Sequence, residues 1–327
     1  MKINIGNIEL SSPVVLAPMS GVTDLPYRRL VKKFGAGLVV SEMVASRAMI
    51  AHSRQSLQKC AIETDENDAT KACVQLAGCD PDVIAESAKI NEEMGAKIID
   101  LNFGCPAKKV VGGFAGSALM KDLKLAKAIL EKTVKAVKIP VTLKMRMGWD
   151  DNSKNAVELA QIAENEGVQL ITVHGRTRCQ FYTGKADWKF ISKVKDVVKI
   201  PVIANGDIKC IKTALLALEE SKANGIMIGR GCYGKPWLIN QVAHYLLYKQ
   251  ELPDPSVQQQ LDIVLEHYNA MLDYYGEEVG LKLARKHVAW YSSGMPSSGE
   301  FRARINQLTN AKEVTDQIKE FYNSIIV

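Results

Sequence analysis

The sequence PVIANGDIKCIKTALLALEESKANGIMIGRG, from Pro201 to Gly231, decides the fold of this 327-residue chain. It holds two short apolar runs, PVIAN and GIMIG, on either side of a stretch with helical character. Runs that are apolar nearly throughout, without alternation, are typical of parallel strands covered on both faces. Six more runs of this kind lie earlier in the chain: Val14–Pro18, Leu38–Glu42, Ala72–Leu76, Ile98–Asn102, Val141–Met145 and Leu170–His174.

The segments between these runs are expected to be helices. Asp80 and Pro81 open one of them, because Asp caps a helix start and Pro suits the first turn, and Gly95 closes it. The segment from Asn152 to Glu166 shows the same pattern. Eight strand–helix units within about 240 residues match the size of a closed (β/α)8 TIM barrel, an α/β fold. A doubly wound open sheet is the alternative, which the absence of G-x-G-x-x-G after the first strand disfavours.

The pattern changes after Trp237, where no further strand is indicated. Two prolines in Leu252–Pro255 cannot lie inside a helix and indicate a linker. From Val257 onward we expect three or four helices. We therefore divide the chain into a TIM-barrel domain, residues 1–245, and a small C-terminal helical bundle domain, residues 252–327. One helix of the bundle carries an apolar stripe: Leu281, Ala284, Val288 and Tyr291.

The composition, with 47% hydrophobic and 24% charged residues, is that of an ordinary globular protein and excludes a disordered or collagen-like chain. Seven cysteines, an odd number with no C-x-x-C pair, argue against a disulfide framework and against a structural metal site. Free thiols fit a reducing cytoplasm. The apolar runs are far shorter than the roughly 20 residues of a membrane span. We expect a cytoplasmic monomer with no membrane partner and no metal.

Polar side chains follow nearly every apolar run. In a barrel, catalytic groups sit at the carboxyl ends of the strands, so these side chains should converge on one mouth. Loops after the seventh and eighth strands commonly bind phosphate through backbone N–H groups. Asn205-Gly206-Asp207 and Gly229-Arg230 therefore predict a phosphate site, with Arg230 as a cation able to form two hydrogen bonds. Two ordinary glycine turns are the alternative.

Cys105 and Lys144 stand at the ends of the fourth and fifth runs. Cys105 follows its strand on a Gly/Pro turn, and an ordinary thiol is mostly protonated at neutral pH, which suits a proton donor. Lys144 ends an apolar strand and would aim a cation at developing negative charge. A small buried thiol and a lysine that reaches solvent are the alternatives.

Gln75 and His174 end two further strands. Gln75 offers both a donor and an acceptor, which fits recognition of a ring with amide edges. His174 could hold a phosphate, bind substrate or act in acid–base chemistry, and a structural hydrogen bond at the strand end is an equal alternative.

The C-terminal helices carry one basic face. Lys282, Arg285 and Lys286 stand at i, i+3 and i+4, which places them together on a helix and could form a contact with a phosphate backbone. A solvated helix face is the alternative. Residues 251–327 contain 7 Lys and Arg against 11 Asp and Glu, a net −4 within a total of +6, so residues 1–250 carry +10. Charge alone therefore does not favour RNA binding by the helices.

Taken together, nine motifs resemble the tRNA-dihydrouridine synthases, with the bacterial B type as the nearest pattern. The resemblance runs from about residue 5 to 310, and the combination of GCPAKKV, IANGDI and ARKH is highly specific. The motifs are APMSGVTD (Ala17–Asp24), VQLAG (Val74–Gly78), NFGCPAKKV (Asn102–Val110), GSALM (Gly116–Met120), VTLKMRMGW (Val141–Trp149), HGRT (His174–Thr177), VIANGDI (Val202–Ile208), IGRGCYGKPW (Ile228–Trp237) and ARKHVAWY (Ala284–Tyr291).

The resemblance implies an FMN-dependent enzyme that reduces the C5–C6 double bond of tRNA D-loop uridines, with NADPH as reductant. Hydride would pass from flavin N5 to uracil C6, and Cys105 would donate the proton to C5. Lys144 would stabilise the anionic reduced flavin, and Gln75 would bind its pyrimidine edge. The other expected FMN-binding residues are Pro18, Met19, Ser20, His174, Asn205, Gly206, Asp207, Gly229 and Arg230. The expected substrate-binding residues are Asn102, Arg176, Lys282, Arg285 and Lys286.

Two other functions are compatible with the pattern. One is a different FMN barrel reductase acting on a free pyrimidine, similar to a dihydroorotate dehydrogenase, although a free-base enzyme has no use for the C-terminal helices. The other is a tRNA-binding chaperone without catalytic activity.

Overall fold

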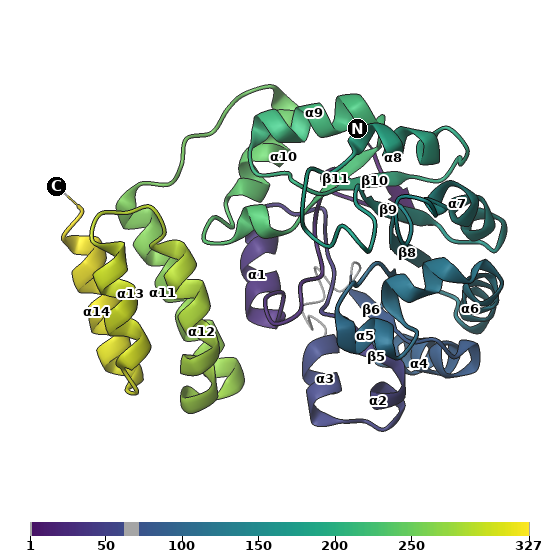
Figure 1. The fold of residues 1–327 in the computed structure, drawn as a ribbon. Helices are drawn as coiled ribbons and strands as arrows, with labels where there is room; N and C mark the ends of the chain where they lie inside the picture. Colours follow the sequence, from purple (N-terminus) through teal and green to yellow (C-terminus); the bar gives the residue numbers. More distant parts are fainter. Residues whose placement is uncertain (1, 62–71, 327) are drawn as a thin grey trace.

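A parallel β-sheet forms the centre of the molecule (Figure 1). The computed structural model describes residues 2–61 and 72–326. Within those residues the sheet has nine strands, in the order β4-β3-β11-β10-β9-β8-β7-β6-β5. All eight predicted runs contain a strand. The strands are β3 (Val14–Leu16), β4 (Leu38–Val39), β5 (Val44–Ala45), β6 (Cys73–Ala77), β7 (Ile98–Phe103), β8 (Val141–Arg146), β9 (Leu170–His174), β10 (Val202–Asn205) and β11 (Gly225–Ile228).

The sheet closes on itself through one stretch of chain, residues 38–45. Its first part, β4, pairs with β3, and its last part, β5, pairs with β6. Between them, Val40 forms a parallel bridge to Cys73, and the Ser41 N–H donates to the Cys73 carbonyl. The ring of strands is therefore continuous. This confirms the TIM barrel and excludes the open doubly wound sheet, whose edge strands would not meet.

Helices surround the barrel. Asp80 caps α4 by accepting from the N–H groups of Asp82 and Val83, as predicted. The helix α7 begins at Ala156, not near Asn152, because the Asp150 carboxylate ties residues 150–153 into a turn. The barrel helices are α1 (Leu25–Lys33), α2 (Ser46–Ile50), α3 (Arg54–Cys60), α4 (Pro81–Glu93), α5 (Lys108–Gly112), α6 (Leu123–Ala136), α7 (Ala156–Asn165), α8 (Trp188–Lys195), α9 (Ile211–Ser221) and α10 (Leu238–Tyr248), with 3-10 turns η2 (Gly116–Lys121) and η3 (Arg230–Cys232).

A short hairpin, β1 (Asn4–Ile5) and β2 (Ile8–Glu9), closes the amino-terminal end of the barrel. Its neighbours Ile3 and Ile5 are fully buried and pack with residues from the barrel interior, among them Leu38, Ile98 and Ile203. The hairpin was not foreseen from sequence. Because apolar side chains fill this end, the opposite, carboxyl-terminal end is the one open to chemistry.

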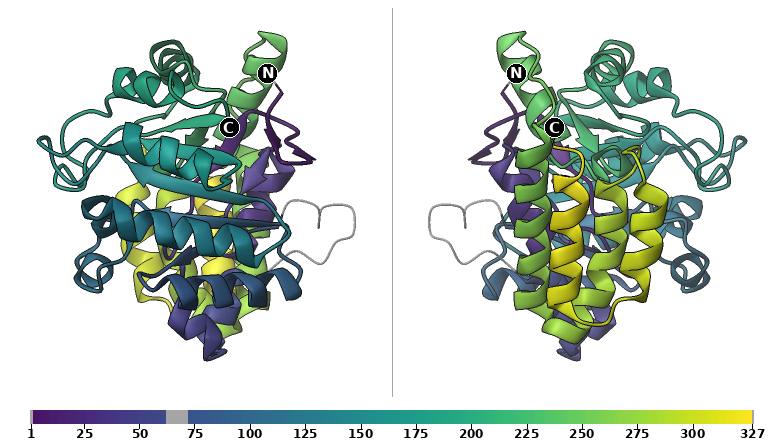
Figure 2. Two further views of the ribbon diagram at one scale, coloured as in Figure 1. Left: turned by 90° about the vertical axis from the view of Figure 1, so that its right-hand side faces the viewer. Right: turned by 90° about the vertical axis from the view of Figure 1, so that its left-hand side faces the viewer.

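Four further helices lie side by side along one flank of the barrel (Figure 2). They are α11 (Val257–Tyr275), α12 (Glu277–Tyr291), α13 (Ser298–Gln307) and α14 (Ala311–Asn323). The predicted stripe from Leu281 to Tyr291 is buried in their common core. Helix α11 packs against α1 of the barrel. No helix in residues 2–61 and 72–326 combines the length and apolar character needed to cross a membrane.

Aromatic rings fill the junction between the barrel and these helices. Trp290 stacks on Tyr233 with the ring centroids 4.0 Å apart, and Gly234 at φ +69° lets the backbones meet there. A Cβ on Gly234 would lie 2.2 Å from the Trp290 carbonyl oxygen. At the same junction His267 and His287 meet edge to face, with their ring centroids 4.7 Å apart. Both rings are buried, and each leaves its Nε2 without a hydrogen bond in the described structure.

Burial lowers the pKa of His267 to about 3, so the ring stays neutral in the folded protein. The unfolded chain binds a proton near the ordinary pKa, so stability is complete above about pH 6.5 and is lost as the pH falls below it. Between pH 7 and about pH 5, the free energy of unfolding should fall by roughly 2 kcal/mol less in His267→Gln than in the wild type. Urea unfolding of both proteins at the two pH values measures this. An equal fall in the free energy of unfolding of both proteins would contradict the prediction. Asp24, whose pKa is raised by burial to about 6, favours the folded state as the pH falls, and it does so equally in both proteins.

Candidate functional site

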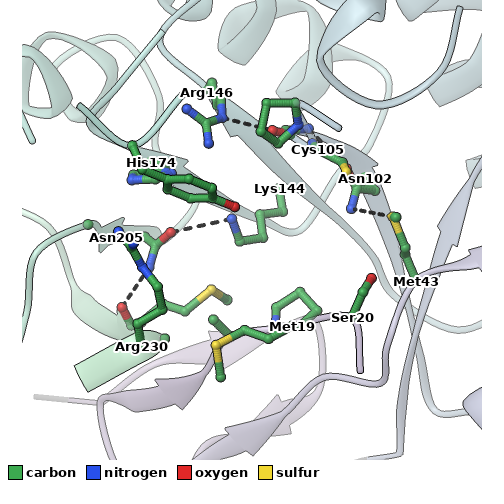
Figure 3. Close-up of a pocket in the computed structure, with 18 of the residues that line it drawn as sticks. Met19, Ser20, Met43, Asn102, Cys105, Lys144, Arg146, His174, Asn205 and Arg230 are labelled. Atoms are coloured by element: carbon green, nitrogen blue, oxygen red, sulfur yellow. Dashed lines mark hydrogen bonds between the residues drawn. The ribbon is translucent and has the colours of Figure 1, made fainter. Parts of the chain in front are cut away.

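A cavity of about 360 Å³ opens at the carboxyl ends of the barrel strands (Figure 3). The strands β6, β7, β8, β9, β10 and β11 contribute residues to its lining, and the segment that follows β3 contributes Ala17–Ser20, which is the convergence that the barrel predicts. It brings together thirteen of the predicted site residues: Pro18, Met19, Ser20, Gln75, Asn102, Cys105, Lys144, His174, Asn205, Gly206, Asp207, Gly229 and Arg230.

One side of the cavity has the donors of an anion site. Gly206, Asp207 and Ile208 line the cavity, and their N–H groups make no hydrogen bond in the described part of the chain. Gly206 has φ +116°, and a Cβ there would lie 2.8 Å from the His174 ring and from Ala186. Only glycine therefore fits at this turn. Together with the Arg230 guanidinium, these groups suit a phosphate.

Arg176, which was predicted to bind substrate, is not among the residues that line the cavity. Its side chain is 2% exposed and lies behind the anion site. It donates to the carbonyl oxygens of Thr183 and Gly184 and pairs with the Asp207 carboxylate at 2.7 Å. The same carboxylate accepts from the Ala186 N–H. Arg176 and Asp207 therefore fix the loop that presents the free N–H groups.

A chain of buried hydrogen bonds leads from the barrel interior to Cys105. Asp100 accepts from Thr142 and from the Gln75 amide, each at 2.6 Å, and burial raises the Asp100 pKa. Asn102 donates to the Gln75 carbonyl oxygen at 2.7 Å. Its own carbonyl oxygen accepts from the Cys105 N–H at 2.9 Å. The Asn102 amide, predicted to bind substrate, is thus engaged in holding the cysteine loop.

The backbone of Cys105 is fixed on both sides, while its half-buried side chain faces the cavity. Its carbonyl oxygen accepts from the N–H and the hydroxyl of Ser117. Gly116 makes this possible, because a Cβ there would lie 2.7 Å from the Cys105 carbonyl oxygen. The thiol is therefore held in one place relative to the opposite wall.

Lys144 and His174 lie between the anion site and Cys105 (Figure 3). Lys144 Nζ lies 3.4 Å from the side-chain oxygen Oδ1 of Asn205, and burial with the nearby charge of Arg146 lowers the Lys144 pKa to about 8. Burial also holds the His174 pKa well below its usual value, so the ring is neutral. Arg176 Nη1, which can only donate, lies 3.4 Å from His174 Nε2, so this nitrogen is the acceptor. A neutral His174 cannot be an acid near neutral pH.

Thirteen lining residues were not among the predicted site residues, and two of them, Arg146 and Tyr182, bring large polar side chains to the cavity. Arg146 is buried and donates to Gly104, Thr177 and Phe181, so it ties the cysteine loop to the loop after β9. It stands two residues after Lys144 on one strand, and that spacing places both side chains on the same face. Tyr182, half exposed, lies with its ring centroid 4.4 Å from the Arg230 guanidinium carbon and 5.6 Å from that of Arg146. Tyr182 is in a loop, where the spacing of residues along the sequence does not predict the direction in which a side chain points.

The three cations of α12 do not line the cavity, and their side chains point to different partners. Lys282 pairs with Glu278 on the exposed surface at 2.7 Å. Arg285 turns inward and donates to the Leu308 carbonyl at 2.7 Å. Lys286 reaches the barrel and donates to the Gly21 carbonyl. The spacing on the helix is as predicted, but the cations do not form one free basic face.

The chain matches known proteins over almost its entire length. A family model described as Dihydrouridine synthase (Dus) matches residues 15–326. A Rickettsia bellii (strain RML369-C) protein named "Probable tRNA-dihydrouridine synthase" is 68% identical over 324 residues, 99% of this chain and 99% of that protein. The "tRNA-dihydrouridine synthase B" of Pseudomonas aeruginosa is 43% identical over 320 residues, 98% of this chain and 96% of that protein.

Solved structures share the barrel at low sequence identity. The old yellow enzyme homologue of Zymomonas mobilis superposes with a TM-score of 0.51 at 13% identity, over 79% of this chain and 95% of that chain. The 6-hydroxypseudooxynicotine amine oxidase of Pseudomonas geniculata N1 superposes with a TM-score of 0.56 at 13% identity, over 74% of this chain and 48% of that chain. These likenesses support the fold.

Proposed function

The chain belongs to the dihydrouridine synthase family, and we propose that it uses FMN and NADPH to reduce uridines of the tRNA D-loop to 5,6-dihydrouridine. The family consists of flavin-dependent oxidoreductases, and tRNA is the substrate class. The observation that carries the finer proposal is the layout of the cavity. An anion site, a buried lysine and a fixed cysteine follow one another along it, as a phosphorylated flavin with a pyrimidine stacked on it would require.

The residues present fit FMN. The free N–H groups of residues 206–208 and the Arg230 side chain would hold its phosphate. Lys144 and Gln75 would meet the pyrimidine edge of the ring, and Pro18–Ser20 would pack along its face. When bound, FMN supplies the hydride that adds to C6 of the uracil.

The protein itself supplies the proton and the charge. Cys105 would donate a proton to C5 of the uracil, since its loop is fixed and its side chain faces the cavity. Lys144 would keep its positive charge next to the negative charge that develops during reduction, in a buried place where such an interaction is strong. The half-exposed ring of Tyr182 would contact the uracil or its ribose, and the buried Arg146 side chain would support the wall beside it.

We further propose that residues 1–245 form the FMN-binding catalytic domain and that residues 252–327 form the tRNA-binding domain of a cytoplasmic monomer. The charge is unevenly distributed, because the C-terminal part is net negative and the barrel carries the positive excess. The barrel surface would then supply most of the electrostatic attraction to the tRNA backbone, and Lys282 at the surface of α12 would add a local contact.

The test is to purify the protein and supply NADPH with unmodified tRNA, then to map dihydrouridine in tRNA from cells that lack the protein. We expect bound FMN, dihydrouridine formation in the D-loop, and loss of specific D-loop sites in the deleted strain. Turnover of free uridine or orotate but not of tRNA would identify a free-pyrimidine reductase instead. Binding of tRNA with no dihydrouridine formed would identify a chaperone.

A further inference from the structure

We propose that Lys286 and Tyr275, both in the C-terminal helices, are positioning residues that hold the pocket loop, residues 18–24, and thereby set one wall of the cavity. The inference rests on the proposed FMN function. It assigns to Lys286 a role inside the protein in place of the contact with tRNA that the sequence predicts.

The pocket loop joins β3 to α1 and begins with lining residues of the cavity. Pro18, Met19 and Ser20 line the wall that faces Lys144 (Figure 3). The loop is folded tightly, because the Met19 carbonyl accepts from the N–H groups of Val22 and Thr23, and the Thr23 hydroxyl accepts from the Met19 N–H. A shift at the tip of such a closed turn therefore moves Met19 and Ser20 as well.

Gly21 at the tip of the loop is held from two directions. Its N–H donates to the carboxylate of Glu42, which is buried at the end of the second predicted strand run. Its carbonyl accepts from the ammonium of Lys286, which belongs to α12. Gly21 has φ +74°, so its carbonyl can face the helices at no steric cost. The barrel and the C-terminal helices thus hold the two sides of one residue, Gly21.

Asp24 at the end of the loop is shared in the same way. One carboxylate oxygen caps α1 by accepting from the Tyr27 N–H at 3.0 Å. The other oxygen accepts from the Tyr275 hydroxyl, at the end of α11, at 3.1 Å. Asp24 is 4% exposed, so water cannot replace the tyrosine easily. Loss of the Tyr275 contact therefore leaves one oxygen of a buried carboxylate without its partner, which is costly, whereas Lys286 acts on the exposed tip of the loop.

Lys286→Met keeps the length of the side chain and removes the donor. In protein without tRNA, we expect the Kd for FMN, measured from flavin fluorescence, to rise by up to about tenfold, the limit reached when FMN binding must supply the whole free energy of the lost charge-assisted hydrogen bond to order the loop. The absorption band of the flavin at saturating FMN should also change shape. Lys286→Arg should restore both properties, and Tyr275→Phe should change the band in the same direction.

Two controls separate positioning from general destabilisation. Lys33→Met removes the exposed ion pair between α1 and Glu266 of α11, which joins the barrel to the helices without touching the pocket loop. Ile305→Ala opens a cavity in the core of the C-terminal helices and lowers the unfolding temperature. We expect both controls to keep the wild-type flavin spectrum.

The outcomes are distinct. If wild-type protein binds no FMN, the proposed function fails. If the wild type binds FMN and Lys286→Met has the same Kd and spectrum, the positioning role is wrong. Lys286→Met could instead leave the flavin spectrum unchanged and lower the slope of tRNA affinity against salt by about one. That result would make Lys286 a contact to a tRNA phosphate. Should Lys286→Met fail to fold, an unchanged spectrum in Tyr275→Phe would refute the proposal.

Discussion

Replacing Cys105 by alanine is expected to lower the rate of dihydrouridine formation by roughly 10²–10⁴-fold, the usual contribution of a positioned acid. Cys105 is the acid that we propose for C5, because its loop is fixed by hydrogen bonds and its side chain faces the cavity, whereas burial holds His174 in its neutral form. Binding of FMN and tRNA should change little, since the loop around Cys105 is held by backbone contacts that alanine retains.

The measurement is single-turnover formation of dihydrouridine after the flavin has been reduced, so that the reductive step does not mask the effect. Cys179→Ala is the matched control, because Cys179 is exposed in the loop after β9 and does not line the cavity. Wild-type rates in Cys105→Ala would exclude Cys105 as the proton donor.

Lys144→Met should slow reduction of the bound flavin by NADPH by roughly 10²–10³-fold, the loss seen when one preorganised electrostatic contact is removed. The methionine fills the same space, but the positive charge of Lys144 is then missing beside the negative charge that develops there. Stopped-flow absorbance of the flavin reports the rate directly. Lys138→Met, an exposed lysine just before β8 at the closed end of the barrel, serves as control.

The same lysine predicts a pH dependence. Burial lowers its pKa to about 8, so the cation is present below that pH and is lost as the pH rises through it. Flavin reduction in the wild type should therefore fall above about pH 8, whereas the already slow Lys144→Met should show no such fall. An identical alkaline limb in both proteins would assign the titration to another group.

Most of the fold could be predicted from apolar patterning. Each run from Val14 onward proved to contain a strand, because a strand buried on both faces has to be apolar throughout and few other segments are. The hairpin at Asn4–Glu9 was missed because two-residue strands leave no pattern. The start of α7 was misplaced because the turn at Asp150 depends on side-chain hydrogen bonds.

The family and half of the residues that line the cavity also followed from sequence. Residues at the carboxyl ends of parallel strands must meet at one mouth, so Gln75, Lys144 and Asn205 could be placed there from their position in the runs alone. The family model and the relatives confirm the resemblance that the motifs indicated.

What each polar side chain does was decided by the tertiary structure. Asn102 and Arg176 look like substrate contacts in the sequence, yet Asn102 holds Cys105 and Arg176 lies buried behind Asp207. Lys286 looks like part of a basic helix face, yet it reaches Gly21 across the junction. The physical reason is the distance along the chain over which each feature is determined. Strands and their ends depend on neighbouring residues, and the direction of a strand fixes where its end points. The partner of a long side chain depends on which distant segment is packed beside it.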